Sequence, residues 1–312
     1  MITTIRLMRE ADVDAVREVD GAAFGAWWEQ LRGAGSRRPL RTRANVLACR
    51  QRDPDVFPPQ ASRADFKVRI FTPAKELPFA GHPVVGTHWA LAHLGRVDLR
   101  EPVTQVCFEL GVGVLPADLH VVGGRVERVV MTQDRLTFHA VLEDVTALAA
   151  GLGLAPAAII ETGLPVHVVS TGVPQMMAPV RSLAEVQRLD AAQIDVAALN
   201  RACRAGDTEC VMVFTLETER PESTVHVRMF APLLGVPEDP ATGSANGALG
   251  AYLVRHRAIP VTEPTTSIVS EQGAEINRPS TLYVEVDSRA EEITAVRVGG
   301  QVVLVAEGSV RF

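Results

Sequence analysis

The sequence lacks the features that would assign it to several common functional classes. It has no long basic run and its formal net charge is −6, so it carries no electrostatic footprint for nucleic acid or an anionic membrane. No apolar stretch approaches the roughly 20 residues of a membrane helix, and Arg6 introduces charge too early for a signal peptide. We therefore expect a cytoplasmic protein that acts on a small molecule, with no nucleic-acid or membrane partner.

Cysteine is also scarce. The four cysteines include no Cys-x-x-Cys pair and have no histidine cluster nearby, although a disulfide framework or a zinc site would need such spacing. We expect reduced structural thiols and no metal. What the sequence does contain is a large apolar fraction, 47% of 312 residues, which is enough for two domains of ordinary size. The cysteines are Cys49, Cys107, Cys203 and Cys210.

The chain contains an internal repeat. The segment VRIFTP at 68–73 recurs as VRMFAP at 227–232. Each copy continues through a short loop to a proline and a glycine, PFAGH at 78–82 and PATGS at 240–244, and a helical pattern of apolar residues follows. The repeat therefore predicts a strand, a loop, a glycine turn and a helix in each half.

The two glycine turns are candidate anion sites. The first N–H groups of a helix have no partner within it, and they bind anions. Gly81 and Gly243 let a ligand approach the backbone closely, while His82 and Ser244 add a hydrogen-bond donor beside it. Either turn alone is more simply a helix start with its cap, but a repeated pair favours convergence on one cleft.

Carboxylates precede both turns, which suits proton transfer. Asp239 is the strongest candidate. For Glu238, and likewise Glu76, an ordinary charge favoured by the helix dipole is a competing interpretation. Five histidines in helical or strand patterns have no partner motif, and we interpret them as structural or surface residues: His88, His93, His139, His167 and His256.

These motifs resemble those of the phenazine-biosynthesis PhzF-like isomerase family, from about Phe57 to Phe312. The resemblance rests on RIFTP at 69–73, ELPFAGHP at 76–83, EDPATGSA at 238–245, QG at 272–273 and RPS at 278–280. It implies an α+β fold like that of diaminopimelate epimerase. Such a fold has two pseudo-symmetric halves, each a mostly antiparallel sheet curled around a central helix, and members are commonly homodimers.

The same resemblance implies cofactor-free proton transfer on a small carboxylate-bearing substrate. By motif, Gly81 and His82 would contact the substrate, and Asp239 would hold or polarise it. Ser244, with Gly243, would bind the substrate carboxylate at the second helix start. The epimerases carry a cysteine at each glycine turn, whereas this chain has His82 and Ser244, so a two-thiol racemase is disfavoured.

The N-terminal segment 1–55 departs from the family. Family members begin with a strand, a proline-rich turn, a helix and a strand whose glutamate shuttles the proton. Here Arg9 to Leu31 has the pattern of one amphipathic helix, and the segment resembles the start of a GNAT-type acetyltransferase without its acetyl-coenzyme A loop. Asp53 and Asp55 lie where the glutamate is expected. We predict an atypical segment 1–55, a first half 56–118, with the C-terminal strand as a candidate to complete it, and a second half 119–312.

Three interpretations of this departure stay open. Asp53 or Asp55 replaces the glutamate as the shuttle, the protein binds its ligand without turnover, or the gene product is a chimera whose first half folds poorly. The leading functional hypothesis is therefore an isomerase. The alternative is a small-acid-binding homologue that has lost its shuttle, and a remnant acetyltransferase ranks third.

Overall fold

The computed structural model describes residues 57, 59–71, 76–77, 81–133, 135–302 and 304. The two candidate shuttles, Asp53 and Asp55, lie outside these residues, as does the segment that resembles an acetyltransferase. The division into 1–55, 56–118 and 119–312 stays a prediction. In the part of the chain that the structure describes, no helix combines the length and apolar character needed to cross a membrane.

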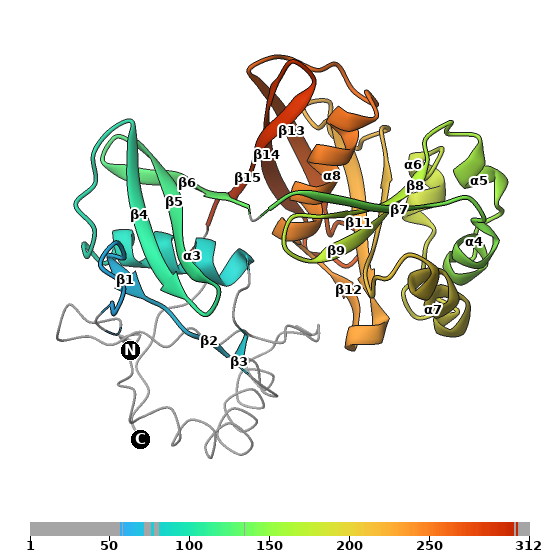
Figure 1. The fold of residues 1–312 in the computed structure, drawn as a ribbon, viewed down its shortest axis with the longest axis horizontal. Helices are drawn as coiled ribbons and strands as arrows, with labels where there is room; N and C mark the ends of the chain where they lie inside the picture. Colours follow the sequence, from blue (N-terminus) through green and yellow to red (C-terminus); the bar gives the residue numbers. More distant parts are fainter. Residues whose placement is uncertain are drawn as a thin grey trace. The chain divides into compact units, whose positions relative to one another are not determined.

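Contacts divide the chain into two units. The first unit ends at Val129 and also includes the chain from Val302 onward, and the second unit is Val130–Gln301. In the first unit (Figure 1), β4 and β5 form a long antiparallel hairpin and β1 lies parallel to β4. Helix α3 packs on this sheet, with the buried His88 ring stacked on Phe108 at 3.5 Å between centroids. The elements are β1 (Phe66–Lys67), β2 (Ile70–Phe71), β3 (Glu76–Leu77), α3 (Gly81–His93), β4 (Val103–Leu110), β5 (Gly113–Val122) and β6 (Arg125–Thr132), which crosses the boundary.

The second unit is built on one large sheet with the strand order β15-β14-β13-β11-β10-β9-β8-β7. Most neighbouring pairs are antiparallel; β9–β10 and β11–β13 are parallel. Its elements are β7 (Thr137–Leu142), α4 (Thr146–Leu152), α5 (Ala157–Ile160), β8 (Val166–Ser170), β9 (Pro174–Pro179), α6 (Leu183–Gln187), α7 (Val196–Ala205), β10 (Val211–Thr215), β11 (Val225–Ala231), the 3-10 helix η2 (Pro232–Leu234), β12 (Val236–Asp239), α8 (Gly243–Arg255), β13 (Thr265–Gln272), β14 (Ser280–Arg289) and β15 (Glu292–Gly300).

Helix α8 is the central helix of this unit. All ten residues from Ala245 to Val254 are buried, and the helix contacts β8 and β9 on one side and β13, β14 and β15 on another. A helix that is apolar all round must be enclosed, so the sheet curls around it. A second core, formed with α4 to α7, covers the other side of β8, β9 and β10. The expected α+β fold, with a sheet around a central helix, is confirmed.

One predicted element is wrong. The apolar spacing from Leu183 to Ala202 predicts a single helix, but the structure has two, α6 and α7. Two aspartates interrupt the pattern by binding backbone amides. Asp190 accepts a hydrogen bond from the Ala192 amide, and Asp195 caps α7 by accepting from the amides of Ala197 and Ala198. Aspartate competes with helical hydrogen bonds in this way, so it favours turns and helix starts.

The internal repeat is confirmed in the local structure of both units. Helices α3 and α8 each begin at the predicted glycine and each contain 13 residues. The strand before each helix pairs antiparallel with the strand preceding it, β2 with β3 and β11 with β12. The pair Ile70↔Leu77 in the first unit corresponds to Met229↔Asp239 in the second. The repeat thus places Asp239 where the first unit has an apolar residue.

Candidate functional site

The candidate site in the second unit is the corner where β12 ends at Asp239 and α8 begins at Gly243. Between them, Thr242 is extended (φ −110°, ψ 96°) and occupies the N-cap position. Its side chain caps no helix amide; its Oγ1 donates a hydrogen bond to Asp239 Oδ2 instead. The first amides of α8 have no partner within the helix, so the corner combines a carboxylate with N–H groups that the helix itself does not satisfy.

Gln272, at the end of β13, holds this corner together. Its Nε2 donates to the Asp239 carbonyl oxygen at 2.7 Å and to Thr242 Oγ1 at 3.2 Å. Its Oε1 accepts from the Thr242 amide at 3.1 Å and from Asn246 Nδ2 at 2.9 Å. Gln272 and Asn246 are each 1% exposed, so water does not compete for these bonds.

Sheet topology explains why Gln272 meets Asp239. Strand β11 pairs with β10 along one edge, while β13 and β12 share the other edge in succession. Gln272 lies opposite Val227 and Asp239 lies opposite Met229, two residues further along β11. The ends of β12 and β13 therefore meet at the same point of the sheet.

The glycine after Gln272 permits the close approach of the next loop. Gly273 has φ +83°, and an added Cβ would lie 2.4 Å from the Arg278 carbonyl oxygen and 2.7 Å from that of Pro240. No side chain fits there, and the backbone conformation itself favours glycine. Gly243 differs, because the nearest described atom outside its own helix would lie 4.0 Å from an added Cβ, at Val298 Cγ1. Packing against the described residues therefore does not demand glycine at 243, which is consistent with a position kept small for a ligand.

Ser244 is the second residue of α8. Its carbonyl oxygen accepts a hydrogen bond from Thr171 Oγ1 at 3.1 Å, which ties the helix start to the β8–β9 turn. Asp239, Gly243 and Ser244 are all half-buried. The structure thus brings three of the predicted site residues to one partly accessible corner.

In the first unit, Gly81 is half-buried and begins α3, with His82 as the second helical residue. This matches the predicted helix start. The His82 side chain lies outside the described part of the structure. Convergence of this helix start with the corner at Asp239 stays a prediction.

Glu238 is neither a loop charge nor a free acid. Its carboxylate forms a two-point ion pair with Arg228, at 2.7 Å from Nη2 and 2.9 Å from Nε, and both side chains are only 3% exposed. Arg228 Nη1 also donates to the carbonyl oxygens of Val186 and Leu189. The role of Glu238 is therefore to fix β12, next to Asp239, onto β11.

A second buried cluster lies on the same strand. The fully buried His226 ring contacts Glu271 Oε1 at 2.9 Å through Nδ1 and Glu275 Oε1 at 2.7 Å through Nε2. Burial alone lowers the pKa of His226, but hydrogen bonds with the two carboxylates outweigh it, and the net shift is upward. Burial likewise raises the pKa of Glu271, but hydrogen bonds, first from the Glu219 amide and then from His226, bring it down to about 2.

Sequence reasoning missed Gln272 as a site residue, and it also missed Arg228 and His226. A usable signal existed for the last two. They alternate with valine in VHVRMF at 225–230, and every residue of this strand is buried. Charged groups in such a strand must be paired. No comparable local signal identifies Gln272, because its partners lie about 30 residues earlier in the chain.

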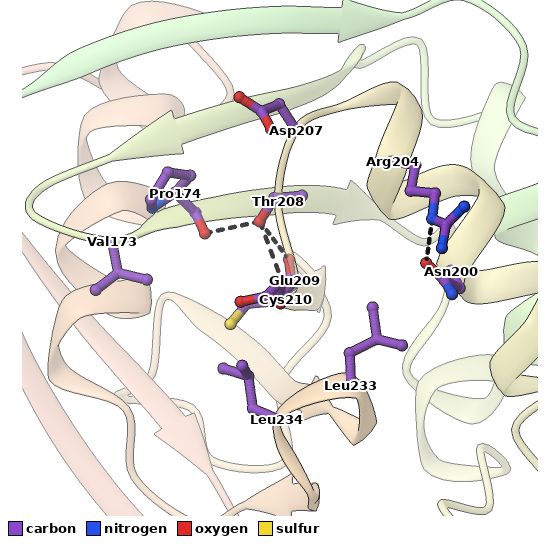
Figure 2. Close-up of a pocket in the computed structure, with 10 residues that line it drawn as sticks. All are labelled: Val173, Pro174, Asn200, Arg204, Asp207, Thr208, Glu209, Cys210, Leu233 and Leu234. Atoms are coloured by element: carbon purple, nitrogen blue, oxygen red, sulfur yellow. Dashed lines mark hydrogen bonds between the residues drawn. The ribbon is translucent and has the colours of Figure 1, made fainter.

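A separate pocket of about 610 Å³ lies beside α7 and η2 (Figure 2). The Thr208 hydroxyl in its wall is already hydrogen-bonded to Pro174 at 2.7 Å, and burial raises the pKa of the Cys210 thiol to about 12. A thiol that stays protonated is a poor nucleophile. The pocket includes none of the predicted site residues, so we do not assign the chemistry to it. It is lined by Val173, Pro174, Asn200, Arg204, Asp207, Thr208, Glu209, Cys210, Leu233 and Leu234.

Comparison with known proteins gives a consistent set of matches. The family model described as phenazine biosynthesis-like protein matches residues 55–308. The trans-2,3-dihydro-3-hydroxyanthranilate isomerase of Pseudomonas aeruginosa is 34% identical over 256 residues, which cover 81% of each chain. An uncharacterized isomerase of Clostridium acetobutylicum is 31% identical over 252 residues, or 80% of each chain.

Solved structures agree with the sequence matches. A phenazine biosynthesis protein of the PhzF family from Bacillus anthracis superposes with a TM-score of 0.66 at 25% identity, covering 78% of this chain and 79% of the other. A protein described as a predicted epimerase from Pseudomonas aeruginosa gives 0.65 at 28% identity, covering 95% and 90%. A hydroxyproline epimerase from Agrobacterium vitis, at 18% identity and a TM-score of 0.51, covering 82% and 71%, shares the fold.

Proposed function

The chain belongs to the family of phenazine biosynthesis-like proteins, and from this premise we propose that it is an isomerase that moves a proton on a small carboxylate-bearing substrate. The matched relatives support isomerase activity in general terms. As substrate class we propose cyclic amino acids of the kind named for the Pseudomonas relative, trans-2,3-dihydro-3-hydroxyanthranilate. A homodimer and a cytoplasmic location remain predictions.

The observation that carries this proposal is the corner at Asp239. The Asp239 carboxylate lies four residues before the start of α8, whose first amides lack partners within the helix. Amides at a helix start favour a bound anion, and they also stabilise negative charge that develops on a substrate during proton removal. Gly243 and Ser244 would hold the substrate carboxylate, while Asp239 would accept a hydrogen bond from its amino or hydroxyl group.

Proton transfer itself requires a group that both removes and returns a proton. The candidates from the sequence are His82, which follows the glycine of the first unit, and Asp53 or Asp55. We propose that Gly81 and His82 face the same substrate as Asp239, which would make one cleft of the two repeated turns. An isomerisation conserves all atoms, so a single shuttling group suffices when it delivers the proton to a second carbon of the ring.

Deuterium incorporation from heavy water tests this function. The protein is incubated with trans-2,3-dihydro-3-hydroxyanthranilate in D₂O, and NMR follows both conversion and label. We expect conversion with deuterium at one ring carbon, and we expect Asp239→Asn to abolish both while the melting temperature changes little. Asp144→Asn, which removes the same charge from an exposed turn before α4, is the matched control and should keep full activity.

Each outcome discriminates. Binding of the compound without conversion or exchange would overturn the proposal of an isomerase and would support the alternative, a protein that only binds a small acid. Full activity in Asp239→Asn would reject the assigned site while leaving the family's reaction in place.

A further inference from the structure

Two backbone groups fix the orientation of the Gln272 side-chain amide. A backbone N–H can only donate, so the atom that faces the Thr242 amide at 3.1 Å must be the oxygen of Gln272. A backbone carbonyl can only accept, so the atom that faces the Asp239 carbonyl at 2.7 Å must be the nitrogen. The usual ambiguity between oxygen and nitrogen in a glutamine side chain is thus resolved by its neighbours.

This orientation determines the direction of the next two hydrogen bonds. The second N–H of Gln272 points to Thr242 Oγ1 at 3.2 Å, so the Thr242 hydroxyl is an acceptor there. The single hydroxyl proton then remains for Asp239 Oδ2, which must accept it. The Asp239 carboxylate is therefore the acceptor at the end of this chain of hydrogen bonds.

The other carboxylate oxygen of Asp239 has a different environment. Thr242 is the only side chain in the described ranges that hydrogen-bonds to the Asp239 carboxylate, and it uses Oδ2. Oδ1 accepts no hydrogen bond from the described residues and belongs to a half-buried side chain. One oxygen is engaged by Thr242, and no residue that the structure describes occupies the other.

We propose that Gln272 and Thr242 are positioning residues that hold Asp239 as a hydrogen-bond acceptor, with Oδ2 occupied and Oδ1 presented to a donor group of the substrate. This inference rests on the proposed function, and it narrows the substrate class: the substrate must carry an N–H or O–H donor near its carboxylate. We call the hydrogen-bonded chain from Gln272 through Thr242 to Asp239 the relay. Asn246 supports it by donating to Gln272 Oε1 at 2.9 Å and to the Thr242 carbonyl at 3.0 Å. The relay is rigid because both Gln272 and Asn246 are buried.

The test compares, by isothermal titration calorimetry, the affinities of two carboxylates: 3-hydroxyanthranilate, which carries N–H and O–H donors, and benzoate, which carries none. Thr242→Val removes the hydroxyl and keeps the shape. Because Asp239 then loses the hydrogen bond that orients it, the binding of 3-hydroxyanthranilate should weaken by about tenfold, while that of benzoate should change little. Thr242→Ser should restore the preference for 3-hydroxyanthranilate.

A second variant reverses the relay at its source. Gln272→Glu replaces the donating nitrogen by an oxygen, so the Thr242 hydroxyl can donate to the new carboxylate instead of Asp239. The added charge repels both ligands alike, so the expected result is again a fall in the ratio of the two affinities. The control is Thr265→Val, which removes a similar hydrogen bond of 2.7 Å to Asp287 on β14 and should leave both affinities unchanged.

An unchanged ratio of the two affinities in folded Thr242→Val or Gln272→Glu would overturn the relay, and so would equal affinities for the two ligands in the unaltered protein. A lower ratio confined to these two variants would support it. Binding needs no turnover, so this result is separate from the fate of the proposed function: a protein that shows the lower ratio but does not isomerise trans-2,3-dihydro-3-hydroxyanthranilate retains the relay and loses the assigned reaction.

Discussion

Arg228 shows how a single residue can support the site without reaching it. Its guanidinium is paired at two points with Glu238, the residue before Asp239, and both side chains are buried. Taking a charge out of water costs several kcal/mol unless a partner offsets it. The ion pair therefore anchors β12 strongly. Replacing only one of its two side chains leaves the other as a buried, unpaired charge.

We predict that Arg228→Met lowers the free energy of unfolding by about 3–5 kcal/mol, and that adding Glu238→Leu recovers much of this loss, since both charges are then absent. Denaturant unfolding measures both effects. Arg257→Met is the control. The side chain of Arg257 is 70% exposed and that of its partner Glu291 is 79% exposed, and exposed ion pairs contribute no more than about 1 kcal/mol. Equal losses for the two arginine variants would contradict the assigned importance of burial.

At the residue scale, the sequence carries a signal where the residues are close in the chain. Asp239, Gly243 and Ser244 lie in one short motif, and the structure places them at one corner, while their role as a site stays a proposal. Gln272 eluded prediction as a site residue because its role depends on the edge that β12 and β13 share on β11, which is a product of the fold. For Glu238 the sequence allowed a functional acid or an ordinary charge near a helix start. Neither interpretation included its ion pair with Arg228, which forms because β12 pairs with β11.

At the scale of elements, the two 13-residue helices that follow the glycine turns have different surroundings. In α8, an added Cβ on Gly250 would lie 2.6 Å from Val284 Cγ1 and 3.2 Å from Val286 Cγ2, both in the buried core. In α3, an added Cβ on Gly86 would meet no described atom within 4 Å. In the second unit, the side chains of β14 therefore pack closely against α8 at Gly250, where the helix has no side chain.

We predict opposite effects of the same substitution in these helices. Gly250→Ala should destabilise by about 1 kcal/mol, because overpacking of a core costs more than the gain in helix propensity. Gly86→Ala should stabilise by about 0.5–1 kcal/mol, since only the propensity gain applies. Thermal unfolding of both variants checks the sign, and stabilisation by Gly250→Ala would contradict the packing described for α8.

Element boundaries were predictable where glycine and apolar periodicity agree, as at the starts of α3 and α8. They were not predictable between 183 and 202. There the apolar spacing continues through a turn, and only the hydrogen bonds of Asp190 and Asp195 to nearby amides divide the helix into α6 and α7. A helical pattern says which face is apolar, but short polar side chains decide whether the backbone continues.

At the scale of the whole molecule, the repeat and the family match lead to the same proposal. Residues 55–308 match the family model, which leaves out most of the N-terminal segment that the sequence sets apart. The central proposal is that the helix starts at Gly81 and Gly243 would bind one carboxylate-bearing substrate together with Asp239.

A crystal structure with 3-hydroxyanthranilate tests that claim most directly, because this stable aromatic compound carries the same carboxylate, amino and hydroxyl groups as the proposed substrate. We expect one bound molecule whose carboxylate accepts hydrogen bonds from the amides at Gly243 and Ser244. Its donor group should face Asp239 Oδ1, and the backbone at Gly81 should contact the same molecule. A ligand bound at one helix start alone, or in the pocket beside α7, would contradict the account.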